Sequence, residues 1–153
     1  MNISINIASI LFYLIPLGLL TGPFLPDLFL SLIVIIFLLN VIISKNYEYF
    51  NNKFFIIFIL FYLYLILNSA ISEYSYISFK SSLFYFRFGI FSLATIFLIK
   101  QNPNFIKYFF WILLFTFLFA IIDGFYQYNY DISIFGISHD MPNRLTLAFN
   151  DKL

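Results

Sequence analysis

Five long apolar runs, separated by short polar breaks, constrain this chain more than any other feature. Each run is about 18 residues long, close to the length that a helix needs to cross the hydrocarbon core of a bilayer. Only 10% of the 153 residues are charged and 63% are hydrophobic, whereas roughly 25% are charged in soluble domains. We therefore predict an all-α fold, a polytopic membrane helix bundle of about five transmembrane helices. The expected spans, within a single membrane domain covering residues 1–153, are residues 3–20, 26–43, 54–71, 82–99 and 105–122.

The break between the first two runs contains Gly22, Pro23, Pro26 and Asp27. We interpret Gly22, which precedes a proline, as the stop of the first helix rather than as a dimerisation face. Pro26 and Asp27 suit the first turn of the second helix, where proline is tolerated and a carboxylate meets the positive end of the helix dipole. No lysine or arginine precedes Lys45, so the first run is expected to be a retained helix rather than a signal peptide.

The lysines and arginines of the short loops predict the orientation of the bundle. With alternating spans, one side receives four of these cations and the other side receives only Lys80. Because cytoplasmic loops carry an excess of positive charge, the first side, and with it the N-terminus, is expected to be cytoplasmic. The tail, residues 123–153, is then expected to be outside and irregular. The four cations of the expected cytoplasmic side are Lys45, Lys53, Lys100 and Lys107.

Several kinds of chemistry are excluded or disfavoured by residue types that are missing or rare. The chain has no cysteine, which excludes disulfides, thiolate nucleophiles and cysteine-ligated metals. Its one histidine, His139, cannot form a histidine cluster, and His139 followed by Asp140 is not a catalytic pair because adjacent side chains rarely face one target. We expect no metal, no cofactor and no nucleic-acid partner, and the catalytic residues, if there are any, are unknown from the residues alone.

Three cations are candidate contacts for an anionic group, because guanidinium and ammonium groups bind phosphate. Arg87 lies inside the fourth run, and Lys80 precedes it by seven residues, so both share one face if that helix starts early. Arg144 lies in the tail. Each has a structural alternative: Arg87 is a snorkelling anchor or a partner for Glu73 or Asp123, and Arg144 is simply solvated.

Three pieces of the chain resemble the N-terminal part of the bacterial O-antigen polymerase and O-antigen ligase family of membrane glycosyltransferases. They are the stretch Leu17–Leu28 with its Gly-Pro-Phe-Leu-Pro-Asp core, the stretch Tyr85–Phe88, and Asp123–Tyr128 followed by Asn143–Thr146. Their order and membrane placement match that family, and together they span most of the chain. The residues 149–152 depart from the glycine-containing form expected after the last piece, which affects the register of the tail.

The resemblance implies a substrate, a location and a partial role. Such proteins transfer an undecaprenyl-pyrophosphate-linked glycan on the periplasmic face of the bacterial inner (cytoplasmic) membrane, without a metal. The partners implied are the lipid bilayer and this glycan, and Arg87 and Arg144 are pattern matches to arginines of the family. The family has roughly ten or more spans, so the chain is expected to be the truncated front part of a longer protein, inactive alone.

Two non-enzymatic functions stand beside this hypothesis. A polysaccharide flippase or permease fragment would place polar residues near the midplane of several spans, whereas Asn40 and Asn68 lie near the ends of theirs. A small structural membrane protein, complete at 153 residues, is the other alternative.

Overall fold

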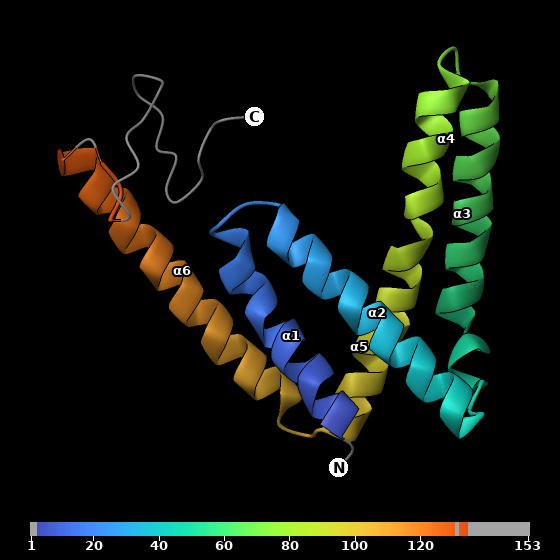
Figure 1. Ribbon diagram of the computed structural model, residues 1–153, viewed down its shortest axis with the longest axis horizontal. Helices are drawn as coiled ribbons and strands as arrows, with labels where there is room; N and C mark the ends of the chain where they lie inside the picture. The colour runs from blue at the N-terminus through green and yellow to red at the C-terminus, as the bar shows by residue number, and fades with distance from the viewer. Residues whose placement is uncertain (1–2, 131, 135–153) are drawn as a thin grey trace. The chain divides into compact units, whose positions relative to one another are not determined.

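The computed structural model describes residues 3–130 and 132–134, and that part of the chain is helical, without a β-strand (Figure 1). The prediction of an all-α membrane helix bundle is confirmed. The elements in chain order are α1 (Ile3–Leu19), α2 (Phe24–Ser44), the short 3₁₀ helix η1 (Glu48–Phe50), α3 (Lys53–Ile71), α4 (Ser75–Phe84), α5 (Phe86–Gln101) and α6 (Phe105–Tyr130).

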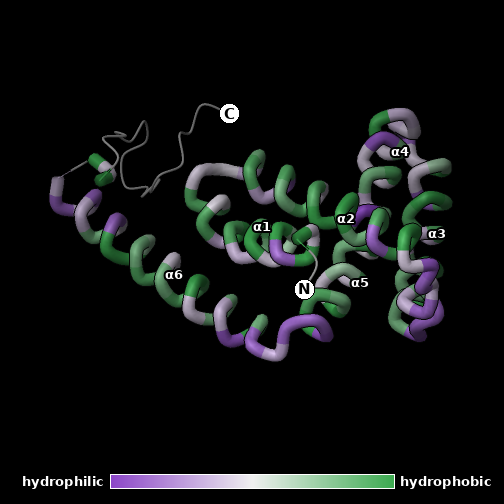
Figure 2. The backbone as a smooth tube through the Cα atoms, turned by 60° about the horizontal axis from the view of Figure 1, so that its bottom comes forward, coloured by the Kyte–Doolittle hydropathy of each residue, from purple (hydrophilic) through white to green (hydrophobic). Residues whose placement is uncertain are grey.

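Four helical segments of the described chain are long and apolar enough to cross a membrane. They are Phe24–Ser44, Lys53–Ile71, Ser75–Gln101, which combines α4 and α5, and Phe105–Tyr130. The expected first span, α1, is apolar but has only 17 residues, or about 26 Å at the rise of an α-helix. Hydrophilic residues gather near the ends of the helices and apolar residues along their middles (Figure 2), as a multi-pass membrane protein requires.

Two predicted helix boundaries are wrong. The sequence predicts a polar loop over residues 72–81, but α4 begins at Ser75, so the turn is only three residues long. Serines favour loops because they compete for backbone hydrogen bonds, yet here the Ser78 hydroxyl pairs with that of Ser72, and the Ser82 hydroxyl donates to the Ser78 carbonyl, one helical turn back, at 2.9 Å. The tail is predicted to be irregular from residue 123, but α6 continues to Tyr130.

The described chain divides into two compact units. The first contains α1, the start of α2 up to Leu30, and α6. Its core is aromatic: the ring of Phe105, 2% exposed, lies 5.0 Å from that of Phe12 and 5.1 Å from that of Tyr13, measured between centroids. These contacts hold the start of α6 against α1.

The turn between α1 and α2 has the structure expected for a glycine stop. Gly22 has a φ of +124°, a conformation that side-chain-bearing residues rarely adopt. The Gly18 carbonyl, near the end of α1, accepts hydrogen bonds from both the backbone N–H of Thr21 at 3.0 Å and the Thr21 hydroxyl at 2.8 Å. Asp27 lies in the first turn of α2, as predicted.

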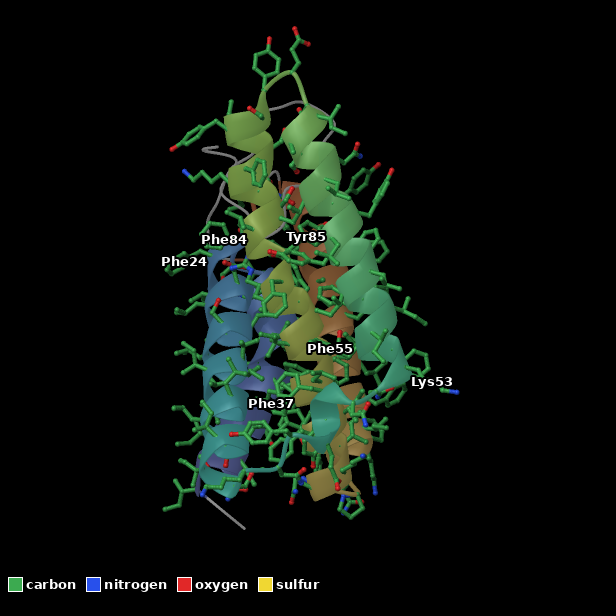
Figure 3. The ribbon with its side chains drawn as sticks, turned by 90° about the vertical axis from the view of Figure 1, so that its right-hand side faces the viewer. Phe24, Phe37, Lys53, Phe55, Phe84 and Tyr85 are labelled. Atoms are coloured by element: carbon green, nitrogen blue, oxygen red, sulfur yellow. The ribbon has the colours of Figure 1, made fainter. Side chains whose placement is uncertain are left out.

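The second unit, Ser31–Asn102, contains the rest of α2, η1, α3, α4 and α5. α3 and α4 lie side by side as a hairpin (Figure 1). Phe37 lies at the centre of an aromatic cluster, with ring centroids 5.6 Å from Phe97 and 5.9 Å from Tyr49, and Figure 3 shows it among rings near one end of α3. A row of stacked rings follows α3 towards the other end, through Phe55, Phe58 and Tyr62.

Candidate anion-binding groove

Lys80 of α4 and Arg87 of α5 line one groove with a volume of about 440 Å³. The sequence predicts that these two cations share a face if the helix starts early, and α4 does start early, at Ser75. The remaining lining residues are mostly apolar or aromatic: Ile77, Ser81, Phe84, Tyr85 and Phe88. The groove therefore combines two positive charges with a largely apolar wall.

The two cations lie on either side of an interruption in the helix at Tyr85. Around it the backbone makes two hydrogen bonds of the tighter 3₁₀ type: Tyr85 N–H to the Ser82 carbonyl and Phe88 N–H to the Tyr85 carbonyl, both 3.1 Å. Figure 3 shows Phe84 and Tyr85 at this junction. Interruptions of this kind inside a span are often found at functional sites, and this one separates the residues that carry the two charges.

Arg87 is half-buried, whereas Lys80 is exposed. The guanidinium carbon of Arg87 lies 5.2 Å from the centroid of the Phe88 ring, within the distance of a cation–π interaction. The ring of Tyr85 lies 5.3 Å from that of Phe88. Arg87 is therefore held beside aromatic rings, while the flexible Lys80 is free to adjust to a ligand at the rim of the groove.

One partner considered for Arg87 in the sequence, Asp123, has a role of its own in α6. Its side chain is 1% exposed, and its Oδ1 accepts a hydrogen bond from the backbone N–H of Ile134 at 2.7 Å. This bond holds residues 132–134 back against the end of α6. The other partner considered, Glu73, is exposed in the turn between α3 and α4.

A cluster of serine hydroxyls between α3 and α4 is a feature that sequence reasoning missed. Ser69 of α3 and Ser82 of α4 share a short hydrogen bond between their hydroxyls, and the hydroxyls of Ser72 and Ser78 lie 2.9 Å apart. Polar contacts of this kind join helices inside membranes. The sequence does contain a signal for this cluster, because Ser78 and Ser82 are one helical turn apart. That spacing can be recognised only when the helix is known to begin at residue 75.

Arg144, His139 and Asp140 lie outside the described residues, so their predicted roles stay predictions. Among residues 3–130 and 132–134, no group of three or more histidine, aspartate or glutamate residues could hold a metal ion. No family model, curated protein or solved structure matches the chain. The groove at Lys80 and Arg87 is therefore interpreted from its own chemistry.

Proposed function

We propose that this chain is a membrane component of cell-surface polysaccharide assembly, and that its groove holds the pyrophosphate of a polyprenol-linked glycan. The observation that carries the proposal is that Lys80 and Arg87 line one groove. The resemblance to O-antigen polymerases and ligases supports the choice of ligand. The substrate, the enzyme class and the location at the bacterial inner membrane all rest on that resemblance.

The chemistry of the groove suits a charged headgroup attached to an apolar tail. A guanidinium group binds two oxygens of a phosphate at once, and an ammonium group adds a second positive charge. Ile77, Phe84 and Phe88 provide apolar wall on which a prenyl chain can lie.

The Lys80 end of the groove lies at a depth that suits a lipid headgroup. The segment Ser75–Gln101 has 27 residues, about 40 Å of helix against a hydrocarbon core of roughly 30 Å. Its ends therefore extend into the headgroup region, and Lys80 lies within the first two turns. A polyprenyl pyrophosphate carries its charge at the level of Lys80, and Arg87, seven residues further along, lies about 10 Å deeper in the span.

In glycosyl transfer from such a donor, an acceptor hydroxyl bonds to the anomeric carbon and loses its proton, while the bond from that carbon to the pyrophosphate oxygen breaks. The departing polyprenyl pyrophosphate gains negative charge. Arg87 and Lys80 would stabilise that charge electrostatically. The proposal assigns them donor binding and leaving-group stabilisation only. The acceptor and the group that activates it are not part of the assignment.

The test is a binding measurement on the purified full chain in phosphatidylcholine nanodiscs, by native mass spectrometry. Undecaprenyl pyrophosphate is compared with undecaprenol, which has the same tail and no charge. We expect the pyrophosphate to bind preferentially, Arg87→Gln to weaken its binding by about tenfold or more, and Arg87→Lys to weaken it less. Lys80→Gln is expected to weaken it by about fivefold.

Lys107→Gln is the matched control, since it removes one lysine at the start of α6, outside the groove. Equal binding of undecaprenol and its pyrophosphate would refute the proposal. So would an Arg87→Gln variant that binds the pyrophosphate as tightly as the unmodified chain. If neither lipid binds and cells that carry the protein export free glycan, the permease alternative is favoured.

A further inference from the structure

A second pocket, of about 430 Å³, lies where the start of α3 and the end of α5 meet η1. Its lining includes Lys53 and Lys100, the carboxylate-bearing Glu48, and Tyr49. Nothing in the proposed function uses these residues. They belong to one unit, and they come together from segments about 50 residues apart in the sequence.

Lys100 has a defined position in this pocket. Its ammonium nitrogen lies 5.4 Å from the centroid of the Tyr49 ring, within the distance of a cation–π interaction. Tyr49 is itself fixed, because its ring packs against that of Phe97 at 5.6 Å. The charge of Lys100 is therefore placed on a rigid aromatic support at the end of α5.

The side chain of Lys53, unlike that of Lys100, extends away from its helix. It is the first residue of α3 and is exposed, and Figure 3 shows its side chain reaching away from the start of that helix. Asn52 caps the helix by accepting a hydrogen bond from the N–H of Phe54 at 3.1 Å, which fixes the backbone beneath Lys53. The exposed side chain of Lys53 can move as a ligand enters from the surrounding lipid, while Lys100 stays in place to bind it.

The location indicates which kind of ligand can enter. α3 and α5 belong to segments long and apolar enough to cross a membrane. The end at which Lys53 and Lys100 line one pocket is therefore expected at one membrane face, at the level of lipid headgroups. The floor contains Leu93 and Ile96 of α5. An apolar floor beneath charged walls matches the boundary between an acyl chain and a phosphate.

The charges indicate the number of negative charges on the ligand. Lys53 and Lys100 contribute two positive charges and Glu48 one negative charge, a net charge of +1. This balances a phosphodiester, which carries one negative charge, better than a phosphate monoester, which approaches two. Basic pockets between membrane helices are a known way of binding lipid headgroups.

We propose that this pocket binds the phosphodiester headgroup of an anionic phospholipid, with Lys100 as the fixed contact and Lys53 closing over it. Phosphatidylglycerol is the probe for such a lipid. The proposal does not depend on the Lys80–Arg87 groove, since the two sites share no residue.

The experiment measures lipid retention by the purified full chain, by native mass spectrometry from nanodiscs that contain equal amounts of phosphatidylglycerol and phosphatidylcholine. We expect phosphatidylglycerol to be retained over phosphatidylcholine, and Lys100→Gln to reduce that preference by about fivefold. Lys53→Gln is expected to reduce it less. Glu48→Gln is expected to increase it, because the variant removes the one negative charge of the lining.

Two variants separate the pocket from general surface charge and from damage to the fold. Lys107→Gln removes a lysine outside the pocket and is expected to keep the full preference. Ile96→Trp keeps every charge, fills the floor of the pocket with a larger side chain, and is expected to lose the preference. Folding of each variant is checked by circular dichroism and by gel filtration in detergent.

The outcomes that overturn the proposal are specific. Equal retention of both lipids, or a Lys107→Gln variant that loses as much preference as Lys100→Gln, would show no specific headgroup site. Displacement of phosphatidylglycerol by millimolar inorganic phosphate would show a site for free phosphate rather than for a lipid. A Glu48→Gln variant with weaker retention would contradict the charge balance on which the choice of ligand depends.

Discussion

The ring of Phe58 in α3 occupies the space next to Gly89 in α5 that a side chain would need. Three atoms of that ring lie within 3.0 Å of the point where a Cβ on residue 89 would be placed, closer than real Cβ contacts come. Gly89 is buried. The close approach of α3 and α5 at this point therefore depends on the absence of a side chain, as is common where helices pack inside membranes.

Gly89→Ala is expected to destabilise the second unit. Alanine is favoured over glycine in a helix by roughly 1 kcal/mol. However, the new methyl group must displace the Phe58 ring, and we expect this overpacking to cost an amount at the upper end of a range of about 1–3 kcal/mol. The expected net loss is about 1–2 kcal/mol, measured by reversible unfolding in mixed detergent micelles. Ser92→Ala, at an exposed position of the same helix, is the control and should change little.

The effect of Gly89→Ala should change sign when Phe58 is removed. In a Phe58→Ala background the new methyl group has space, so only the propensity gain remains and the alanine should stabilise by roughly 0.5–1 kcal/mol. An alanine that destabilises equally in both backgrounds would mean that the ring is not the cause.

The hydroxyl contact between Ser69 and Ser82 is expected to stabilise the α3–α4 hairpin. Ser69→Ala should cost about 0.6 kcal/mol, the average for hydrogen bonds between membrane helices, and no more than about 1.7 kcal/mol, the largest such value. The double variant Ser69→Ala with Ser82→Ala should cost less than the sum of the two single changes, because both remove the same bond. Strict additivity in the unfolding measurement would argue that the two hydroxyls act independently.

The side chain of Asp123 is expected to protect the backbone N–H of Ile134 from hydrogen exchange. Asp123→Ala removes the acceptor of the 2.7 Å bond from the Ile134 N–H, so hydrogen exchange at residues 132–134 should accelerate. A hydrogen bond to a charged group is worth about 1.5–3 kcal/mol, which corresponds to roughly 10- to 150-fold in exchange rate. Asp123→Asn retains an oxygen acceptor and should accelerate exchange less.

Asn129→Ala is the control for this experiment. Its amide donates to the Phe125 carbonyl at 2.8 Å within α6, so its loss should leave exchange at Ile134 unchanged. Unaltered exchange in Asp123→Ala would show that another contact holds residues 132–134 in place.

The orientation of the chain can be tested directly because the chain has no cysteine. Tyr47 and Tyr74 are 58% and 68% exposed and lie in turns at opposite ends of α3. With the predicted orientation, Tyr74→Cys should react with a membrane-impermeant maleimide in intact cells, and Tyr47→Cys only after permeabilisation. The opposite labelling pattern would reverse the assigned faces.

The features that could be predicted from the sequence are those set by composition and by single residues. The apolar runs predict the helices, Gly22 predicts the end of α1, and the spacing of Lys80 and Arg87 predicts that they share one face if the helix starts early. The predicted start at residue 82 fails because serines at 75, 78 and 81 look like loop residues. The hydroxyl contacts of this hairpin, from Ser78 to Ser72 and from Ser82 to Ser69, form only once α3 and α4 lie side by side.

The pocket of Lys53 and Lys100 and the contact of Phe58 with Gly89 could not be predicted in this way. Both depend on which face of α3 meets α5, and apolar residues surround these helices on every side. A helix that is hydrophobic all round has no periodic pattern from which its packed face can be identified. Such contacts are set by the shapes of individual side chains rather than by the hydrophobic pattern.

The interruption at Tyr85 has a mechanical consequence for the groove. Because Lys80 lies before it and Arg87 after it, the separation of the two cations depends on the backbone angles at the junction of α4 and α5, around Tyr85. An anion bound to both cations would link α4 to α5 across this junction, and would restrict bending of the span at that point.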